Sequence, residues 1–217
     1  MKIRLISYSQ ATQEFIGLDN CLDLIAYCAR VSNPSNQMNS ETAEKLVKYL
    51  VKHKHWSPLE MVSATLEIET TRDIARQMLR HRSFSFQEFS QRYADPTLDL
   101  EFVTREARLQ DTKNRQNSIE TDDADLQRDW RMKQEQIIAE AKMAYKWAIE
   151  NGIAKEQARA ILPEGNTVSR LYMAGTLRSW IHYIDLRSEN GTQKEHIEIA
   201  KECANVIARI FPVNEML

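Results

Sequence analysis

Arginine, histidine and hydroxyl side chains are concentrated, with aromatic neighbours, in one short segment, residues 77–93. Arg80, His81 and Arg82 are adjacent, and Arg92 follows in the same segment. Clustered guanidinium groups repel one another unless an anion joins them, and the planar fork of arginine matches a phosphate group. The interleaved phenylalanines offer a surface to a planar ring. These residue types predict a nucleotide or dinucleotide ligand, although cations at a helix end would also complement the helix dipole without any ligand.

Further cations lie beside an apolar stripe between residues 177 and 187. Arg178 and His182 are four residues apart and share a helix face, where a solvated ion-pair surface is the alternative to a ligand contact. Arg187 follows Trp180 by seven residues and extends the apolar stripe of the same predicted helix. A guanidinium at that position needs an anionic partner, or it must reach water at the helix end.

The histidines and cysteines predict neither a metal site nor a thiol nucleophile. His53 and His55 are spaced like a metal-binding pair on a strand, but no third ligand of matching kind lies close by in the sequence. Cys21, Cys28 and Cys203 show no C-x-x-C spacing and lack the neighbours that mark a low thiol pKa. We therefore expect these three residues to be small core side chains, and we expect no metal.

Composition excludes several classes of protein. The 217 residues carry 29 Lys and Arg against 31 Asp and Glu, a net charge of −2, so nucleic acid is not expected to be the main ligand. No two of the five glycines lie closer than ten residues, which excludes the Rossmann fingerprint and the phosphate-binding P-loop. No apolar stretch approaches the ~20 residues that span a bilayer, and residues 1–10 lack a signal-peptide core. We expect a cytoplasmic protein that makes no membrane contact.

Hydrophobic periodicity predicts helices alternating with a few strands. Residues 2–8 and 62–70 are predicted strands, the second from a clean alternation of apolar and polar side chains, and residues 167–173 are a possible third. Helices are predicted at about 20–30, 41–51, 72–80, 126–150, 176–186 and 193–211, with a shorter one ending near Pro163. Trp130 and Trp147 fall in the apolar stripe of the long helix and are predicted to be core.

These elements predict an α+β fold in which helices flank a small sheet. Because no linker rich in Pro, Gly or Ser divides the chain, residues 1–217 are interpreted as one domain. The polar stretch at about 94–126 interrupts the helical pattern and is interpreted as a surface excursion.

The cationic segment also fits a known signature. Residues 80–92 match R-H-R-x-x-S-x-x-x-x-S-x-R at every fixed position, and the chain is identified on this basis as resembling the flavin-dependent thymidylate synthases (ThyX). Further blocks resemble the same family in the same order, at residues 29–32, 55–60, 158–163 and 177–195. The resemblance covers nearly the whole chain outside the polar excursion.

The resemblance implies a reaction and its participants. Members of the family convert dUMP to dTMP, with 5,10-methylenetetrahydrofolate as carbon donor, NADPH as reductant and FAD as hydride carrier. No cysteine attacks the uracil ring, which agrees with the unremarkable cysteines of this chain. The family assembles as a homotetramer with active sites between subunits, so we expect the same assembly here.

Site residues follow from the resemblance, position by position. The residues expected to bind FAD are Ser57, Arg80, His81, Arg82, Glu88, Arg178 and His182. The residues expected to bind dUMP are Gln77, Arg80, Glu88, Ser90, Gln91, Arg92, Arg159 and Arg187. Catalytic roles are expected for Arg187, which would polarise the uracil ring, and for Ser90 and His55. This chain departs from the family pattern at Gln91, where many members have Gly, and at His182, where many have Asn.

Two other functions are compatible with the same residues. A non-enzymatic binder of nucleotides or single-stranded RNA could use the basic and aromatic segment 80–93, with strong salt dependence and no flavin. A flavoenzyme with a different substrate would bind FAD but ignore dUMP.

Overall fold

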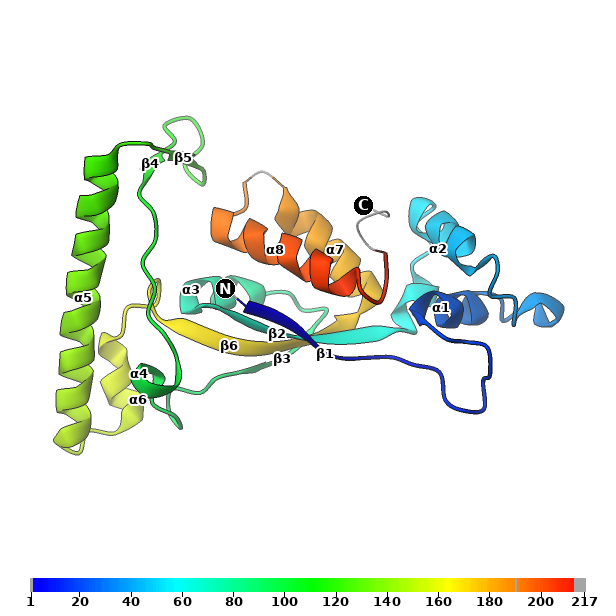
Figure 1. Ribbon diagram of the computed structural model, residues 1–217, viewed down its shortest axis with the longest axis horizontal. Coiled ribbons are helices and arrows are strands. Elements are labelled where there is room, and N and C mark those ends of the chain that lie inside the picture. Colours follow the sequence, from blue (N-terminus) through cyan, green and yellow to red (C-terminus); the bar gives the residue numbers. More distant parts are fainter. Residues whose placement is uncertain (1, 190, 213–217) are drawn as a thin grey trace.

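A four-stranded antiparallel sheet lies at the centre of the computed structural model, which describes residues 2–189 and 191–212 (Figure 1). The strand order is β1 (Lys2–Tyr8), β2 (Ser63–Thr71), β6 (Val168–Thr176) and β3 (Ser85–Glu88). Three helices cover one face of this sheet, namely α3 (Arg72–Met78), α7 (Leu177–Ser188) and α8 (Lys194–Ile207) (Figure 1). This arrangement confirms the predicted α+β class.

The remaining elements extend the chain on either side of the sheet. At one end lie α1 (Cys21–Ala29), α2 (Ala43–Lys52) and the short 3-10 turns η1 (Pro34–Asn36) and η2 (Ser57–Glu60) (Figure 1). At the other end lie α4 (Pro96–Asp99), α5 (Ala124–Glu150), α6 (Lys155–Ala158), η3 (Arg159–Ile161) and the two-stranded ribbon of β4 (Arg108–Gln110) and β5 (Ser118–Glu120) (Figure 1).

The alternating pattern of β2 determines which face of the sheet becomes core. Leu66 and Ile68 point to the helix-covered face and are completely buried. On the other face, Glu67 accepts a hydrogen bond of 2.8 Å from Arg4 of the neighbouring strand. An antiparallel sheet can keep one face polar in this way while the other face packs against helices.

Helix α7 forms the centre of the core and connects it to the sheet. Trp180 is completely buried, and its indole nitrogen donates a hydrogen bond of 3.1 Å to the carbonyl oxygen of Ala64 in β2. Phe84 packs edge-on against Trp180 with ring centroids 4.8 Å apart. This contact holds the chain that enters β3 against α7.

Strand β3 is an element that periodicity does not predict. It pairs antiparallel with β6, so that Ser85 lies opposite Ala174 and Glu88 lies opposite Leu171. A Cβ at Gly175, beside that register, would lie 2.4 Å from the Phe84 ring. Only glycine allows β6 to approach Phe84 this closely.

Local capping explains where the predicted helices begin and end. Asn20 accepts hydrogen bonds from two backbone amides of the first turn of α1, and Asp123 accepts one at the start of α5. Gly152, with φ of +77°, follows the end of α5 in a conformation that favours glycine. Helix α3 ends at Met78, so the Arg80–Arg82 triplet follows the helix instead of forming its last turn.

The polar excursion contains short ordered elements. The helix α4 and the strands β4 and β5 lie within it, and Phe102 forms an isolated bridge with Thr167 next to β6. Helix α5 begins at Ala124, slightly before the predicted start.

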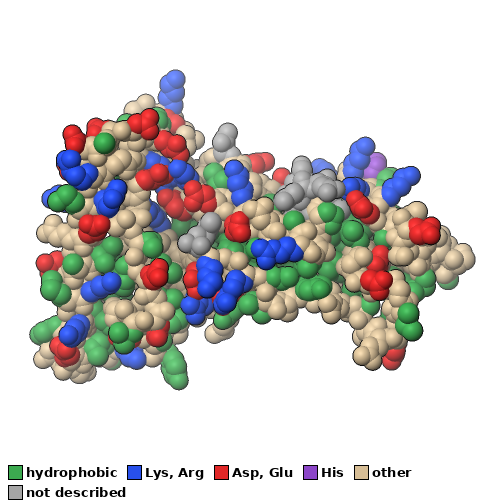
Figure 2. All heavy atoms as spheres, in the orientation of Figure 1, with side chains coloured by type: hydrophobic (Ala, Val, Ile, Leu, Met, Phe, Trp, Pro, Cys, Tyr) green, Lys and Arg blue, Asp and Glu red, His purple; other side chains and the backbone are tan. Residues whose placement is uncertain are grey.

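The prediction that Trp130 and Trp147 are core residues is wrong for the single chain. Their exposed fractions are 44% and 61%. Helix α5 lies at one end of the molecule and buries only a narrow stripe, which includes Ala141, Tyr145 and Ala148. Hydrophobic side chains are therefore visible among charged ones on the surface over α5 (Figure 2).

Across residues 2–189 and 191–212, no helix is both long and apolar enough to cross a membrane.

Candidate active site

Helix α7 and the turn η2 bring one group of predicted residues together. Arg178 donates a hydrogen bond to Glu60, the last residue of η2, and Ser57 is exposed at the start of the same turn. His182, one helical turn after Arg178, lies edge-on to Trp56 with ring centroids 4.5 Å apart. These contacts place the half-buried Arg178 on one surface with the exposed side chains of His182 and Ser57, a set that we call the η2–α7 group.

His55 lies in the turn that precedes η2. Its backbone amide donates a 2.8 Å hydrogen bond to the carbonyl oxygen of Leu50, while its side chain is exposed. Lys54, the residue before it, has a φ of +58°, which is uncommon for a residue with a side chain. The exposed His55 ring lies edge-on to Tyr49 of α2, with ring centroids 6.1 Å apart.

A second group lies where α3, α7 and α8 meet. The guanidinium Nε of Arg187 donates a hydrogen bond of 2.9 Å to Nε2 of His81. Gln77 makes hydrogen bonds at both ends of its amide, to His196 at 3.2 Å and to Gln193 at 2.9 Å. The exposed Arg80 and Arg82 flank His81 in sequence. We call this set the α3–α7–α8 group.

A third group lines a cavity of about 390 Å³. Its polar lining consists of Arg72, Arg76, Gln91, Arg159 and Glu164. Gln91 is only 3% exposed, and its side-chain Nε2 has no hydrogen-bond partner among the described residues. A buried donor without a partner is costly unless a ligand or water satisfies it. We call this the arginine cavity.

Glu88 lies on β3 beside the arginine cavity. It accepts hydrogen bonds of 2.8 Å from Ser169 and 3.2 Å from Arg76. Arg72 is more distant, with its nearest carboxylate oxygens at 3.6 Å on Glu88 and 3.8 Å on Glu164. Both separations exceed hydrogen-bond length, so the buried Arg72 guanidinium keeps donors for a further acceptor.

The charges around the arginine cavity favour an anion. Arg72, Arg76 and Arg159 outnumber the two neighbouring carboxylates of Glu88 and Glu164. Burial lowers the pKa of Arg72 from its ordinary value, as does the positive charge of Arg76, but a guanidinium remains protonated in a protein. A phosphate group would neutralise the remaining positive charge and accept several of these donors at once.

Ser90 and Arg92 are predicted for the same ligand but lie outside the lining of the arginine cavity. Arg92 is exposed and forms an ion pair of 3.1 Å with Glu156. The Ser90 side chain is also exposed, while its carbonyl oxygen accepts backbone hydrogen bonds from Tyr93 and Ala94, both at 3.0 Å.

Electrostatics favour the neutral form of His81 and His182, two of the predicted site histidines. Burial lowers the pKa of His81, and the positive charges of Arg187 and Arg80 lower it further. Burial likewise lowers the pKa of His182, as does the charge of Arg178. Because Arg187 donates to Nε2 of a neutral His81, the ring proton of His81 must lie on Nδ1.

Comparison with known proteins identifies the family of the chain. The family of thymidylate synthase complementing proteins matches residues 2–213. A probable flavin-dependent thymidylate synthase of Paramecium bursaria Chlorella virus 1 is 50% identical over 212 residues, which cover 98% of this chain and 96% of that protein. The chain belongs to the flavin-dependent thymidylate synthases.

Other comparisons extend this result. A flavin-dependent thymidylate synthase of Synechocystis is 50% identical over 189 residues, covering 87% of this chain and 85% of that protein. In fold, the chain is similar to the crystal structure of the UMP/dUMP methylase PolB from Streptomyces cacaoi. That match has a TM-score of 0.80 at 23% identity and covers 98% of this chain and 91% of the other. The predicted family is therefore confirmed.

The cysteines of this flavin-dependent thymidylate synthase are poorly placed for nucleophilic attack. Cys21 and Cys203 are buried, and burial raises the pKa of Cys21 to about 11 and that of Cys203 still further. Burial also raises the pKa of the half-buried Cys28. A thiol attacks as its thiolate, so raised pKa values leave little of the reactive form.

The aromatic residues of segment 80–93 serve the core of this synthase more than its surface. Phe84 packs against Trp180, and Phe86 is partly buried against the same core cluster. Tyr93 differs, with 88% of its surface exposed. A single-stranded RNA binder needs a row of exposed rings for base stacking, and Phe84, Phe86 and the half-buried Phe89 do not provide one.

Sequence reasoning missed several polar residues near the predicted ones. Glu60 lies within residues 55–60, a block that resembles the family, so the sequence did indicate that this partner of Arg178 belongs near the site. No such indication marks Arg72 and His196 in the sequence, because each is one of several polar residues on its helix and acquires its distinctive neighbours only through the fold. Within the described ranges, no three His, Cys, Asp or Glu side chains converge as a metal site.

Proposed function

We propose that this chain converts dUMP to dTMP, with 5,10-methylenetetrahydrofolate as carbon donor, NADPH as reductant and FAD as hydride carrier. The main support is the arginine cavity. Gln91 and Arg159 are far apart in sequence, and the resemblance assigns both to dUMP. The fold places them on one cavity that has an excess of arginine and an unpartnered buried amide. A nucleoside monophosphate satisfies both features.

The donors around the other two groups fit a flavin dinucleotide. The η2–α7 group offers the Ser57 hydroxyl, the Arg178 guanidinium and the His182 imidazole, and the α3–α7–α8 group adds the exposed Arg80 and Arg82. Guanidinium groups suit the diphosphate, while hydroxyl and imidazole groups can bond the polar edge of a flavin ring. When bound, the flavin supplies the hydride for the reaction.

Arg187 is proposed to activate the substrate. Its described side-chain partner is the neutral His81, so no carboxylate among the described residues neutralises its charge. A cation held at the carbonyl edge of uracil would stabilise negative charge that develops on the ring. A nucleophilic thiol is then not required, in agreement with the raised thiol pKa values.

Ser90 and His55 complete the proposed catalytic set. The Ser90 hydroxyl is exposed two residues after β3, and His55 is exposed two residues before η2. We assign them contacts with the reacting nucleotide and with the flavin region, respectively, on the basis of the family resemblance.

We also propose a homotetramer with active sites between subunits. Four of the predicted dUMP-binding residues fall into two sets. Gln77 and Arg187 belong to the α3–α7–α8 group, whereas Gln91 and Arg159 line the arginine cavity, and no hydrogen bond or ion pair between described residues links the two sets. Trp147 on α5, with 61% of its surface exposed, provides an apolar face that a neighbouring subunit could cover.

An absorbance spectrum of the purified protein tests the proposal. The protein should purify yellow or bind added FAD, NADPH should bleach the flavin, and dUMP should perturb its spectrum. A colourless protein that leaves FAD free in a filtration assay contradicts the proposal and favours a non-enzymatic nucleotide binder. A flavin that NADPH bleaches but dUMP does not perturb favours a flavoenzyme with a different substrate.

A further inference from the structure

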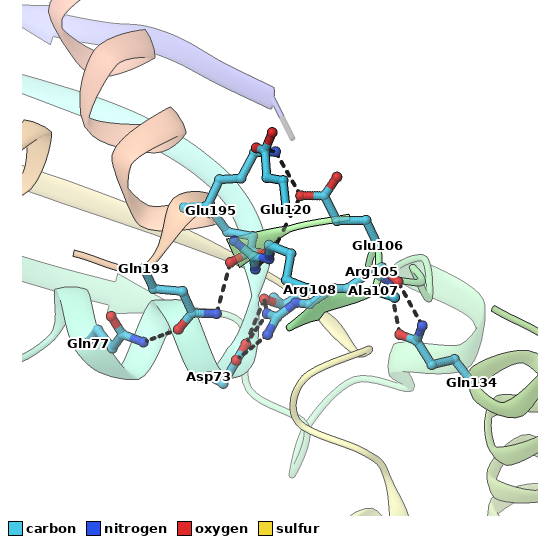
Figure 3. Close-up of polar contacts among 12 residues, drawn as sticks. Asp73, Gln77, Arg105, Glu106, Ala107, Arg108, Glu120, Gln134, Gln193 and Glu195 are labelled. Carbon is cyan, nitrogen blue, oxygen red and sulfur yellow. Dashed lines mark hydrogen bonds and ion pairs between the residues drawn. The ribbon is translucent and has the colours of Figure 1, made fainter. Parts of the chain in front are cut away.

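A chain of hydrogen bonds passes through Gln77 and ends on a carboxylate. Gln77 donates from Nε2 to Oε1 of Gln193 at 2.9 Å, and Gln193 donates from its own Nε2 to Glu195 at 2.9 Å. Arg108, from strand β4, donates to the other carboxylate oxygen of Glu195. Figure 3 shows these side chains side by side between α3, the start of α8 and the β4–β5 ribbon. The polar excursion is thereby connected to a residue of the candidate site.

The other end of the Gln77 amide is held inside the protein. Oε1 of Gln77 lies 3.2 Å from Nδ1 of His196, and Nε2 of His196 lies 3.1 Å from the hydroxyl of Tyr183. His196 is completely buried and Tyr183 is 1% exposed. Neither ring has water to replace a missing partner, so both contacts must be satisfied within the chain.

The carboxylate determines the direction of every bond. Burial raises the pKa of Glu195, but the hydrogen bonds from Arg108, a backbone amide and Gln193, together with the charge of Arg108, outweigh this effect, and the net pKa is below its ordinary value. Ionised Glu195 only accepts, so Gln193 must turn its NH2 toward Glu195 and its oxygen toward Gln77. Gln77 must then turn its own NH2 toward Gln193 and its oxygen toward His196.

His196 fits the same direction because it is neutral. Burial lowers its pKa to about 3, with further lowering from the charges of Arg187 and His81. A neutral imidazole has one donor and one acceptor, so Nδ1 carries the proton for Gln77 and Nε2 accepts from the Tyr183 hydroxyl. In this chain of five residues, every hydrogen bond is donated in the direction from Tyr183 to Glu195, because the charged Glu195 can only accept.

We propose that His196 is a positioning residue that locks the orientation of the Gln77 amide, and that the chain from Glu195 to Tyr183 thereby decides which atoms Gln77 offers to dUMP. The inference rests on the proposed function in taking Gln77 as a contact of dUMP. With both inner bonds made, Gln77 can offer one N–H and one lone pair of Oε1. A flipped amide would place an acceptor where the ligand needs a donor.

Two variants of His196 test the proposal, because the side-chain amides of Asn and Gln each replace a different ring nitrogen of histidine. The amide nitrogen of Asn lies about where Nδ1 lies in histidine, and that of Gln lies about where Nε2 lies. His196→Asn should preserve the bond to Gln77 and keep the dUMP dissociation constant within about twofold of the parent value. His196→Gln should lose that bond and raise the constant about 5- to 10-fold, the effect of roughly one hydrogen bond.

The measurement is dUMP binding to the FAD-loaded enzyme by calorimetry, with KM and kcat measured in parallel. We expect KM to follow the dissociation constant while kcat changes less. Cys203→Ala is the matched control, because Cys203 is also completely buried on α8 but forms none of the hydrogen bonds of this chain, so dUMP binding should not change. Equal binding by His196→Asn and His196→Gln overturns the proposal.

A second readout does not depend on dUMP. In the 15N spectrum of histidine-labelled enzyme, the resonance that disappears in His196→Asn should belong to a neutral ring with its proton on Nδ1. A proton on Nε2 overturns the proposal whatever the ligand. A parent enzyme that shows the expected tautomer but does not bind dUMP contradicts the proposed function instead.

Discussion

The charge of Arg187 leads to a direct prediction about dTMP formation. It extends the apolar face of α7, and its described partner is the imidazole of His81 at 2.9 Å. A preorganised donor that faces developing charge is typically worth about 3–4 kcal/mol, or about 10²–10³ in rate. Arg187→Ala should keep FAD and NADPH-driven flavin reduction but lose dTMP formation by about that factor and weaken dUMP binding.

Arg187→Lys distinguishes a directed contact from charge alone. A single ammonium cannot reproduce the planar fork, so we expect only partial recovery of dTMP formation. Flavin reduction is the internal control in both variants. Turnover by Arg187→Ala within a few-fold of the parent would mean that Arg187 only reaches water at the helix end.

The cysteines are expected to be dispensable for chemistry. A chain in which Cys21, Cys28 and Cys203 are all replaced by Ala should still form dTMP at a rate near that of the parent, because burial raises all three thiol pKa values. Product is measured by chromatography after confirmation of fold and FAD content. Loss of turnover in a folded, FAD-loaded single variant would identify a nucleophile.

Arg72 is expected to contribute to binding of the phosphate group. Its buried guanidinium has no carboxylate within hydrogen-bond distance, the nearest lying at 3.6 Å. A charge-assisted hydrogen bond contributes about 1.5–3 kcal/mol, so Arg72→Met should weaken dUMP binding about 10-fold or more in a calorimetric titration. Binding of deoxyuridine, which lacks the phosphate, should stay unchanged.

Arg4→Met is the matched control for that experiment, because Arg4 pairs with Glu67 on the polar face of the sheet. Equal loss of dUMP and deoxyuridine binding in Arg72→Met would show a structural effect instead of a phosphate contact.

A site residue can be predicted from the sequence when the pattern that marks it lies within one short segment. Arg80, His81 and Arg82 could be found because fixed spacing within one short segment is visible in the sequence. Arg72 and His196 could not be found, because their roles arise from burial and from partners distant in sequence.

At the scale of elements, the close approach of β6 to Phe84 restricts position 175 to glycine. A Cβ at Gly175 would lie 2.4 Å from the Phe84 ring, far inside normal contact. Gly175→Ala should therefore lower the free energy of unfolding by about 1–3 kcal/mol, measured by urea denaturation followed by tryptophan fluorescence.

Gly165→Ala is the control for that change. Its new Cβ would make only ordinary contacts, the nearest at 3.8 Å to Arg105, so stability should be unchanged or slightly higher. If Gly175→Ala is as stable as the parent, the Phe84 ring moves freely and does not hold the start of β3.

Elements with a long periodic signal were predictable, whereas short ones were not. Strand β2 alternates over its whole length and was predicted within one residue at each end. Strand β3 has four residues and forms only because β6 supplies a partner, which no local pattern indicates. The apolar stripe of α5 predicted the helix correctly. A stripe alone does not show whether its side chains are buried by the same chain or by another one.

For the whole molecule, that exposed stripe leads to a prediction about assembly. Trp130 and Trp147 are 44% and 61% exposed, and large aromatic residues commonly dominate the energy of protein interfaces. If α5 packs against a second subunit in the proposed homotetramer, Trp147→Asp should shift the mass measured by light scattering toward smaller species.

Arg128→Ala tests the specificity of that effect. Arg128 is exposed on the same helix, but it pairs with Asp125 at 2.6 Å within its own chain, so its removal should leave the mass unchanged. A parent protein that is an active monomer would contradict the proposed assembly outright.

The division of four predicted dUMP-binding residues into two sets has a genetic consequence. If each active site takes Arg187 from one subunit and Arg159 from another, two defective alleles can rescue each other. Coexpression of Arg187→Ala with Arg159→Ala would form mixed tetramers in which some sites receive both intact arginines. A host unable to make dTMP should then grow with both alleles together and with neither alone. If one chain supplied the whole site, the two alleles together would remain as defective as each one separately.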